Sequence, residues 1–335
     1  MKIPETSEIG ALGVRHVARF WARTLAGRSG GEVPRDAAEW VADNTLLSGL
    51  RVGLRETYRY LLERQPSLAE FEGWVLERNG GTIAEGRIAA LNAALAGEAD
   101  AESRAEDVEA LTAEELAFWD ENGYVVLHDA VTAENCAAAA RAIYEFLGMD
   151  PHDPETWYGG ERAGIWVPLL HHPALWANRD SPRIYQAFRQ LWGRRDLWAS
   201  VDQAGVNPPE RPGWRFVRPH LHFDVSLQLP VPFGVQGILY LTDTAAEQGA
   251  FTCVPGFHRR IEAWLREMPE GEDPRHADLT KLAPGPKAIA GRAGDLVIWH
   301  HALPHGASPN RSSKPRVVQY LKMQPSEWGY TPEWR

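Results

Sequence analysis

Two histidines and an aspartate alternate with apolar residues in the segment HLHFDVSLQ, residues 220–228. If this segment is a strand, residues two apart share one face and lie about 6.5 Å apart along the chain. His222 and Asp224 would then point at the same metal ion, with His220 on the same face. A third ligand would have to come from another part of the chain.

A later segment, GDLVIWHHALPHGASPNRSSKPRVVQYL, offers His300, His301 and His305 as the third ligand. Two histidines and one carboxylate form the facial triad of non-haem Fe(II) oxygenases, which leaves coordination positions open for a co-substrate and O₂. The co-substrate 2-oxoglutarate has a distal carboxylate, which a planar guanidinium can bind with two hydrogen bonds. Arg316 follows His305 by eleven residues and begins an apolar strand. That spacing favours His305 over the other two histidines.

The elements that must position these residues fall into two regions. Residues 1–105 show the apolar spacing of helices, with breaks at Pro66 and at Gly80-Gly81. From residue 196 onward, short apolar segments alternate with loops rich in glycine and proline, which favours a sandwich or barrel. We therefore predict an α+β protein with a helical N-terminal region at 1–105 and a second domain at 106–335, joined by a linker near residues 97–109.

The start of the second region has clear local signals. Thr112 and Glu115 form a capping box that begins a short helix, and the segment YVVL that follows is a predicted strand. Thr132 caps a second helix, which Gly148 ends. The polar segment at 268–289 is a predicted lid or a disordered loop.

Composition excludes several classes of function. Asp and Glu number 45 against 35 Lys and Arg, for a formal charge of −10, which argues against a nucleic-acid-binding protein. No apolar run approaches the 18 residues that a membrane span needs. Cys136 and Cys253 form no CxxC pattern, and reduced thiols in the cytoplasm are the simpler interpretation.

Several separate motifs resemble the phytanoyl-CoA dioxygenase family of Fe(II)/2-oxoglutarate-dependent oxygenases. The resemblance covers residues 111–324 and rests on AFWDENGYVVL, on HFD at 222–224, on LYLTDTAAEQGAFTCVPGFHRR, and on the segment with the distal histidine and arginine. It implies a double-stranded β-helix, a cupin-like jelly roll, with flanking helices. It also implies that His222, Asp224 and His305 bind iron and that Arg316 binds 2-oxoglutarate.

The resemblance suggests further contacts to 2-oxoglutarate and also shows two departures. Tyr240 lies where relatives place an aromatic residue near the co-substrate, and Asn207 could reach the end of the co-substrate opposite Arg316. Many family members have a serine or threonine two residues after the distal histidine or the arginine, but here these positions are Ala307 and Val318. Arg316 would therefore need another helper.

The carboxylate at 224 favours oxygen chemistry, because related halogenases have a small residue there. The implied reaction converts 2-oxoglutarate and O₂ to succinate and CO₂ and hydroxylates a small organic metabolite. The same chemistry could give desaturation, cyclisation or epimerisation. A cupin-like metal enzyme that does not use 2-oxoglutarate and a non-catalytic metal-binding sensor remain as alternatives.

Two further residues are candidate substrate contacts. His220 could line the site or support it structurally, and Arg218 could bind a substrate carboxylate or form a solvated salt bridge. The N-terminal helices could also form a homodimer interface. Pocket walls come from loops, so the sequence does not identify the substrate.

Overall fold

The computed structural model describes residues 2–28, 36–98, 109–216 and 221–331, and the chain divides into two compact units. The first unit combines Met1–Glu106 with Arg194–Val201 and Met323–Pro332. The second unit combines Asp107–Gly193 with Asp202–Lys322 and Glu333–Arg335. Most of the predicted linker near 97–109 lies outside the described residues.

The first unit is a helical bundle with one small sheet. Its helices are α1 (Val17–Arg28), α2 (Ala37–Gly49), α3 (Leu54–Arg64), α4 (Leu68–Arg78) and α5 (Glu85–Leu95), and its sheet pairs β3 (Leu197–Ala199) with β11 (Met323–Pro325). Pro66 separates α3 from α4 as predicted, and Ser67 caps α4 by accepting from the Glu70 amide. Phe20, Leu46 and Phe71 are among the fully buried side chains of its core. The helical prediction for this region is therefore confirmed.

A buried ion-pair network links α1 to α2 in this unit. Asp43 is 1% exposed; it lies 2.9 Å from His16 Nε2 and also pairs with Arg23. Glu39 pairs with Arg19 at 2.6 Å and with Arg23 at 3.0 Å. Every acidic group of the cluster thus has a basic partner, which indicates a structural role.

Replacing Asp43 by asparagine should destabilise the first unit by about 3–5 kcal/mol, because it removes the buried carboxylate that pairs with both His16 and Arg23. Chemical denaturation followed by tryptophan fluorescence measures the loss. Asp36→Ala is the control; Asp36 caps α2 from an exposed position, so its loss should cost only about 1 kcal/mol. Equal destabilisation by the two variants would contradict the buried-pair interpretation.

The second unit begins as its sequence predicts. A capping box at Thr112 starts α6 (Ala113–Asn122), and Gly123, in the left-handed region, ends it. The strand β1 (Tyr124–Leu127) follows, and then Thr132 caps α7 (Ala133–Leu147) with Gly148 at its C-terminus. The remaining helices of the unit are α8 (Pro173–Arg179), α9 (Pro182–Trp192) and α10 (Ile261–Glu267).

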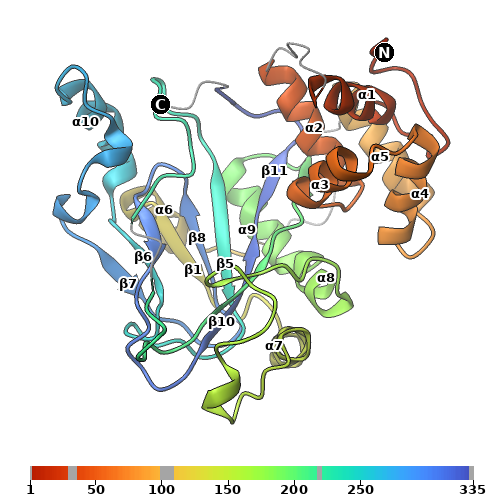
Figure 1. The fold of residues 1–335 in the computed structure, drawn as a ribbon. Helices are drawn as coiled ribbons and strands as arrows, with labels where there is room; N and C mark the ends of the chain where they lie inside the picture. The colour runs from red at the N-terminus through yellow and green to blue at the C-terminus, as the bar shows by residue number, and fades with distance from the viewer. Residues whose placement is uncertain (1, 29–35, 99–108, 217–220, 332–335) are drawn as a thin grey trace. The chain divides into compact units, whose positions relative to one another are not determined.

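Two antiparallel sheets form the centre of the second unit. The larger has six described strands in the order β1-β8-β5-β10-β4-β2, and the smaller has the order β7-β6-β9. Their bounds are β2 (Trp166–Val167), β4 (Ala204–Asn207), β5 (Val235–Tyr240), β6 (Phe251–Cys253), β7 (Lys287–Ile289), β8 (Leu296–His300), β9 (His305–Ala307) and β10 (Arg316–Leu321). Figure 1 shows β5 between β8 and β10. A shared core of Phe223, Phe251, Trp299 and Val318 joins residues of both sheets.

Two predicted elements differ from the structure. Residues 221–230 form no regular strand; their single bridge joins His222 to His305. The segment at 268–289, predicted to be a lid or disordered, contains two short 3₁₀ turns, Pro274–His276 and Leu279–Lys281, and the strand β7. Buried Leu279 anchors the second turn in the core.

Among the described helices, none has both the length and the apolar character needed to cross a membrane.

Candidate metal centre

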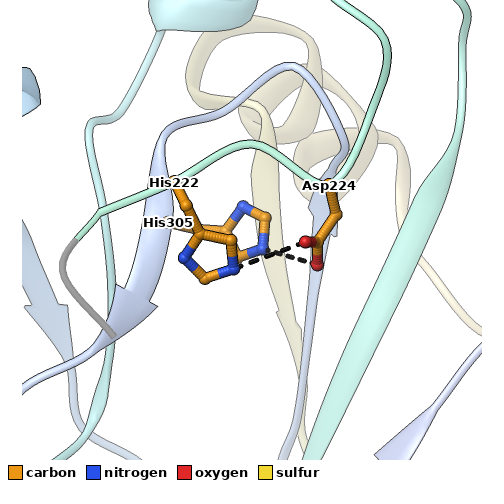
Figure 2. A group of neighbouring side chains, drawn as sticks. All are labelled: His222, Asp224 and His305. Atoms are coloured by element: carbon orange, nitrogen blue, oxygen red, sulfur yellow. Dashed lines mark hydrogen bonds and ion pairs between the residues drawn. The ribbon is translucent and has the colours of Figure 1, made fainter. Parts of the chain in front are cut away.

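Three side chains from two distant segments meet in the second unit. His222 and Asp224 come from the irregular segment after residue 220, and His305 begins β9 (Figure 2). One donor atom from each lies within 4.8 Å of the others. The Nε2 atoms of His222 and His305 each lie 3.4 Å from a carboxylate oxygen of Asp224. The two imidazoles therefore converge on one carboxylate.

Backbone pairing brings the two segments together. The His222 amide donates to the His305 carbonyl at 2.9 Å, and the His305 amide donates to the His222 carbonyl at 3.0 Å. This bridge, rather than a continuous strand, holds the two rings with their centroids 4.7 Å apart. The His222 and Asp224 side chains therefore lie near His305, as the alternating pattern suggested, but they are carried by an irregular segment and not by a strand.

The ring of His305 is fixed in orientation and in tautomer. Its Nδ1 lies 2.9 Å from the Leu303 carbonyl, which can only accept, so Nδ1 carries a proton. Nε2, which lies 3.4 Å from the Asp224 carboxylate, is therefore the nitrogen that can ligate a metal, once it gives up the proton that it shares with that carboxylate. Phe251 and Trp299 pack against the ring at centroid distances of 6.1 and 5.1 Å and keep its side chain 4% exposed.

The Asp224 carboxyl is held in its ionised form. Partial burial would raise the pKa of its carboxyl, but hydrogen bonds from His222 and His305, together with their charges, hold the pKa well below its usual range. The side chains of His222 and Asp224 are 39% and 43% exposed, so the cluster is open on one side. Two imidazole nitrogens, one ionised carboxylate and an open side fit the facial triad of a non-haem iron site.

Arg316 lies in the core of the same unit and is fully buried. Its Nη1 donates to the Gly249 carbonyl at 2.7 Å, whereas Nε and Nη2 are buried without a hydrogen-bond partner among the described residues. Buried donors left unpaired cost about 1–3 kcal/mol each, and more when charged. A guanidinium in this state is suited to receive an anionic ligand.

Asn207 lies directly across the sheet from Arg316, as its partner in the β4–β10 register. Cross-strand partners share one face of a sheet, so the Asn207 and Arg316 side chains lie side by side, and the expected contact of Asn207 with the co-substrate stays a prediction. The side-chain Nδ2 of Asn207 donates to the Ser308 carbonyl at 3.1 Å, and its Oδ1 is buried without a hydrogen-bond partner among the described residues.

The Tyr240 hydroxyl joins the two sheets of the unit, and the expected place of its ring near the co-substrate stays a prediction. Its hydroxyl donates to the Ile289 carbonyl at 2.7 Å and accepts from the Phe251 amide at 3.0 Å. These bonds tie β5 to β6 and β7 of the smaller sheet. Burial raises the pKa of this phenol to about 12, so it remains a neutral structural group.

The structure points to Tyr320, which the sequence analysis missed. Arg316, Val318 and Tyr320 alternate along β10 and share one face. Burial raises the pKa of the Tyr320 phenol, and the charges of Arg316 and Asp224 also act on it, the first lowering and the second raising it. The alternation in RVVQYL was a usable signal for this residue.

Gly205 makes room for the Tyr320 ring. It pairs with Val318 on β10, and a Cβ added at Gly205 would lie 3.1 Å from Tyr320 Cε2. On its other side, Gly205 pairs with Trp166, whose ring packs on Tyr320 at a centroid distance of 4.6 Å. Trp166 is 39% exposed, so this aromatic pair reaches the surface of the unit.

The other sequence candidates lie elsewhere. His300 Nδ1 accepts from the Ala302 amide, and burial lowers the pKa of this imidazole to about 3. His301 is buried against Gly234, and burial lowers its pKa as well. Neither belongs to the triad. Arg218 and His220 lie outside the described residues.

Comparisons with known proteins identify the family of this chain. The family model of phytanoyl-CoA dioxygenase (PhyH) matches residues 119–318, more than half of the chain. A putative phytanoyl-CoA dioxygenase of Dictyostelium discoideum is 23% identical over 260 residues, covering 62% of this chain and 74% of that protein. An ectoine dioxygenase of Bordetella parapertussis is 23% identical over 255 residues, covering 67% of this chain and 81% of that protein.

Among solved structures, the 2-oxoglutarate-dependent carbocyclase SnoK from nogalamycin biosynthesis is 23% identical, with a TM-score of 0.47 over 68% of this chain and 90% of that one. The matched family region contains the three triad residues and Arg316. The chain therefore belongs to the phytanoyl-CoA dioxygenase family and is a non-haem dioxygenase that uses Fe(II), 2-oxoglutarate and O₂.

Proposed function

We propose that this enzyme hydroxylates a small organic metabolite, with His222, Asp224 and His305 as the iron ligands and Arg316 as the anchor for 2-oxoglutarate. The observation that carries the proposal is the buried Arg316 guanidinium, of which two nitrogens have no hydrogen-bond partner among the described residues, in the same unit as the His-Asp-His cluster. Iron with 2-oxoglutarate supplies the oxidising chemistry: O₂ is consumed, succinate and CO₂ are formed, and the substrate is oxidised.

Each protein group has a separate task in this reaction. The Arg316 fork binds the distal carboxylate of 2-oxoglutarate and so fixes the direction in which its keto-acid end points. The Leu303 carbonyl keeps His305 in the ligating tautomer. Phe251 and Trp299 exclude water from the buried side of His305. The partly exposed side of His222 and Asp224 is the side from which substrate approaches.

Tyr320 is proposed as the helper of Arg316, in place of the hydroxyl residues absent at Ala307 and Val318. Tyr320→Phe should raise the KM for 2-oxoglutarate by about tenfold, because a hydrogen bond to a charged group contributes about 1.5–3 kcal/mol. Steady-state succinate release measures the change. Tyr144→Phe, on α7, is the matched control. An unchanged KM in Tyr320→Phe would remove Tyr320 from the co-substrate site.

The test of the function uses the purified protein. Fe(II) and 2-oxoglutarate added under anaerobic conditions should give a weak visible charge-transfer band. When O₂ is then admitted and the members of a metabolite library are tried one by one, succinate release should rise with the true substrate. Mass spectrometry of the product separates hydroxylation, which adds one oxygen atom, from desaturation, cyclisation and epimerisation. Substrate turnover without 2-oxoglutarate, or iron binding with no band, would contradict the proposal.

The two antiparallel sheets are proposed to form a double-stranded β-helix. Chain order supports this topology, because β5 and β8 lie in the larger sheet while β6, β7 and β9 lie in the smaller one. The chain therefore passes repeatedly from one sheet to the other, as in a jelly roll. An experimental structure that leaves the two sheets unpacked would contradict it.

Location and assembly are further proposals. Both cysteines are free and buried, and burial raises the pKa of Cys136 to about 11 and of Cys253 to about 12, consistent with unreactive thiols in a cytoplasm. The helical region at 1–105, together with the segments 194–201 and 323–332 of the same compact unit, is proposed as a domain of its own, with a homodimer interface. Cell fractionation tests the location in the cytoplasm, and light scattering of the full chain tests the homodimer.

A further inference from the structure

The segment between α10 and β7 makes a specific contact with the loop that carries Asp224. Arg275 lies in the first 3₁₀ turn of this segment, Pro274–His276. Its Nη1 donates to the Phe223 carbonyl at 3.2 Å, and its Nη2 donates to the Val225 carbonyl at 2.7 Å. The two nitrogens of one guanidinium thus hold the two carbonyls on either side of Asp224.

This contact supplies support that regular structure does not give. Residues 221–230 form no strand, so their carbonyls have no sheet ladder. The backbone bridge to His305 fixes His222, but among the described residues no backbone hydrogen bond holds Asp224 in the same way. A guanidinium is planar and presents its donors in a rigid fork, so two bonds from it restrict both the position and the rotation of residues 223–225.

Arg275 is itself held in place. Asp273 caps the turn by accepting from the Arg275 amide at 2.9 Å, and Pro274 beside it is buried. The next turn is anchored through Leu279, which belongs to the core around Phe223. The Asp224 charge also favours the Arg275 cation, although burial lowers the pKa of this guanidinium overall.

We propose that Arg275 is a positioning residue of the metal centre, which holds the 223–225 backbone so that the Asp224 carboxylate faces His222 and His305. The inference rests on the proposed function of the triad. It makes the 268–286 segment a brace for a metal ligand, and it assigns a role to a residue outside the motifs that define the site. Removing such supporting contacts typically costs about 10- to 100-fold in metal affinity.

Co(II) titration of the metal-free full-length protein tests this proposal without relying on turnover. Arg275→Met should weaken Co(II) binding by about 10- to 100-fold and change the ligand-field spectrum of the bound ion. Arg275→Lys keeps the charge but offers a point donor in place of the fork, so its affinity should fall between those of Met and wild type. Arg266→Met is the matched control, because the Arg266 side chain is 61% exposed on α10 and pairs with Glu262 of the same helix. This variant should bind Co(II) like wild type.

The outcomes separate this proposal from the proposed function. If wild type binds Co(II) and Arg275→Met binds it with the same affinity and spectrum, Arg275 is merely structural and the inference is wrong, while the triad stands. If wild type binds no Co(II), the triad itself is wrong. Circular dichroism establishes that each variant is folded; should Arg275→Met fail to fold, Arg275→Lys decides, and wild-type affinity in that variant would overturn the proposal.

Discussion

Replacing Asp224 by alanine should reduce succinate release by at least about 100-fold, because a ligand loss must exceed the 10- to 100-fold cost of losing a contact that merely orients a ligand. The carboxylate is the only anionic group of the His-Asp-His cluster. Without the carboxylate, two neutral imidazoles remain to hold the metal, and no ligand from the protein balances the positive charge of the ion. Co(II) titration and succinate assays measure the two losses separately.

The loss should not come from unfolding. Asp224 is 43% exposed, and the cluster offers it only two histidine contacts at 3.4 Å. The thermal midpoint of the metal-free variant should therefore stay close to that of wild type. Asp243→Ala, which removes an exposed carboxylate of the same unit, is the control and should keep full turnover. Wild-type succinate release by Asp224→Ala would refute the assignment of the metal ligands.

Local signals in the sequence predicted much of the fold. Thr112 and Thr132 each accept a hydrogen bond from an amide three residues ahead, which a short stretch of sequence can predict. The structure confirms both helix starts. The apolar strand at 124–127 is likewise set by its own side chains. The pairing of β3 with β11 depends on segments more than a hundred residues apart, and it places both in the first unit. No local pattern reports such a contact.

His222 and Asp224 lie close to His305, although the segment 221–230 that carries them is not the strand that the sequence pattern predicted. Alternation predicted a strand, which would have placed His222 and Asp224 on one face. The backbone instead bridges once to His305 and is then held by the Arg275 side chain, fifty residues further along the chain. Side-chain contacts to a backbone carbonyl leave no periodic signature in a sequence, so this support could not be predicted.

The proposed co-substrate residues divide in the same way. Arg316 was proposed from its spacing after His305, and Tyr320 could have been proposed from the alternation along the same strand. The placement of Asn207 required the register of β4 against β10, because a shift of one residue would turn its side chain to the other face. The hydroxyl contacts of Tyr240 depend on Phe251, 11 residues away, and on Ile289, 49 residues away, on strands of the other sheet.

Replacing Arg316 by methionine should raise the KM for 2-oxoglutarate by about 100-fold or more while changing Co(II) affinity by less than about threefold. The expected loss follows from removing one partner of a buried, bidentate charge pair, which costs about 2–5 kcal/mol. Arg316→Lys should recover only part of the affinity, because a single ammonium cannot reproduce the fork. Succinate kinetics at varied 2-oxoglutarate and Co(II) titration measure the two quantities.

The stability of the metal-free Arg316→Met variant gives an independent check of the same assignment. In wild type, the buried guanidinium donates to the Gly249 carbonyl, and its Nε and Nη2 have no hydrogen-bond partner among the described residues, so part of its burial cost stays uncompensated in the ligand-free protein. Methionine removes that cost and keeps most of the volume, so the thermal midpoint should stay level or rise while 2-oxoglutarate no longer raises it. Arg292→Met, at a 68% exposed side chain, is the control and should still be stabilised by 2-oxoglutarate. If Arg316→Met were instead strongly destabilised and still stabilised by 2-oxoglutarate, the arginine would be a structural residue and the co-substrate would bind elsewhere.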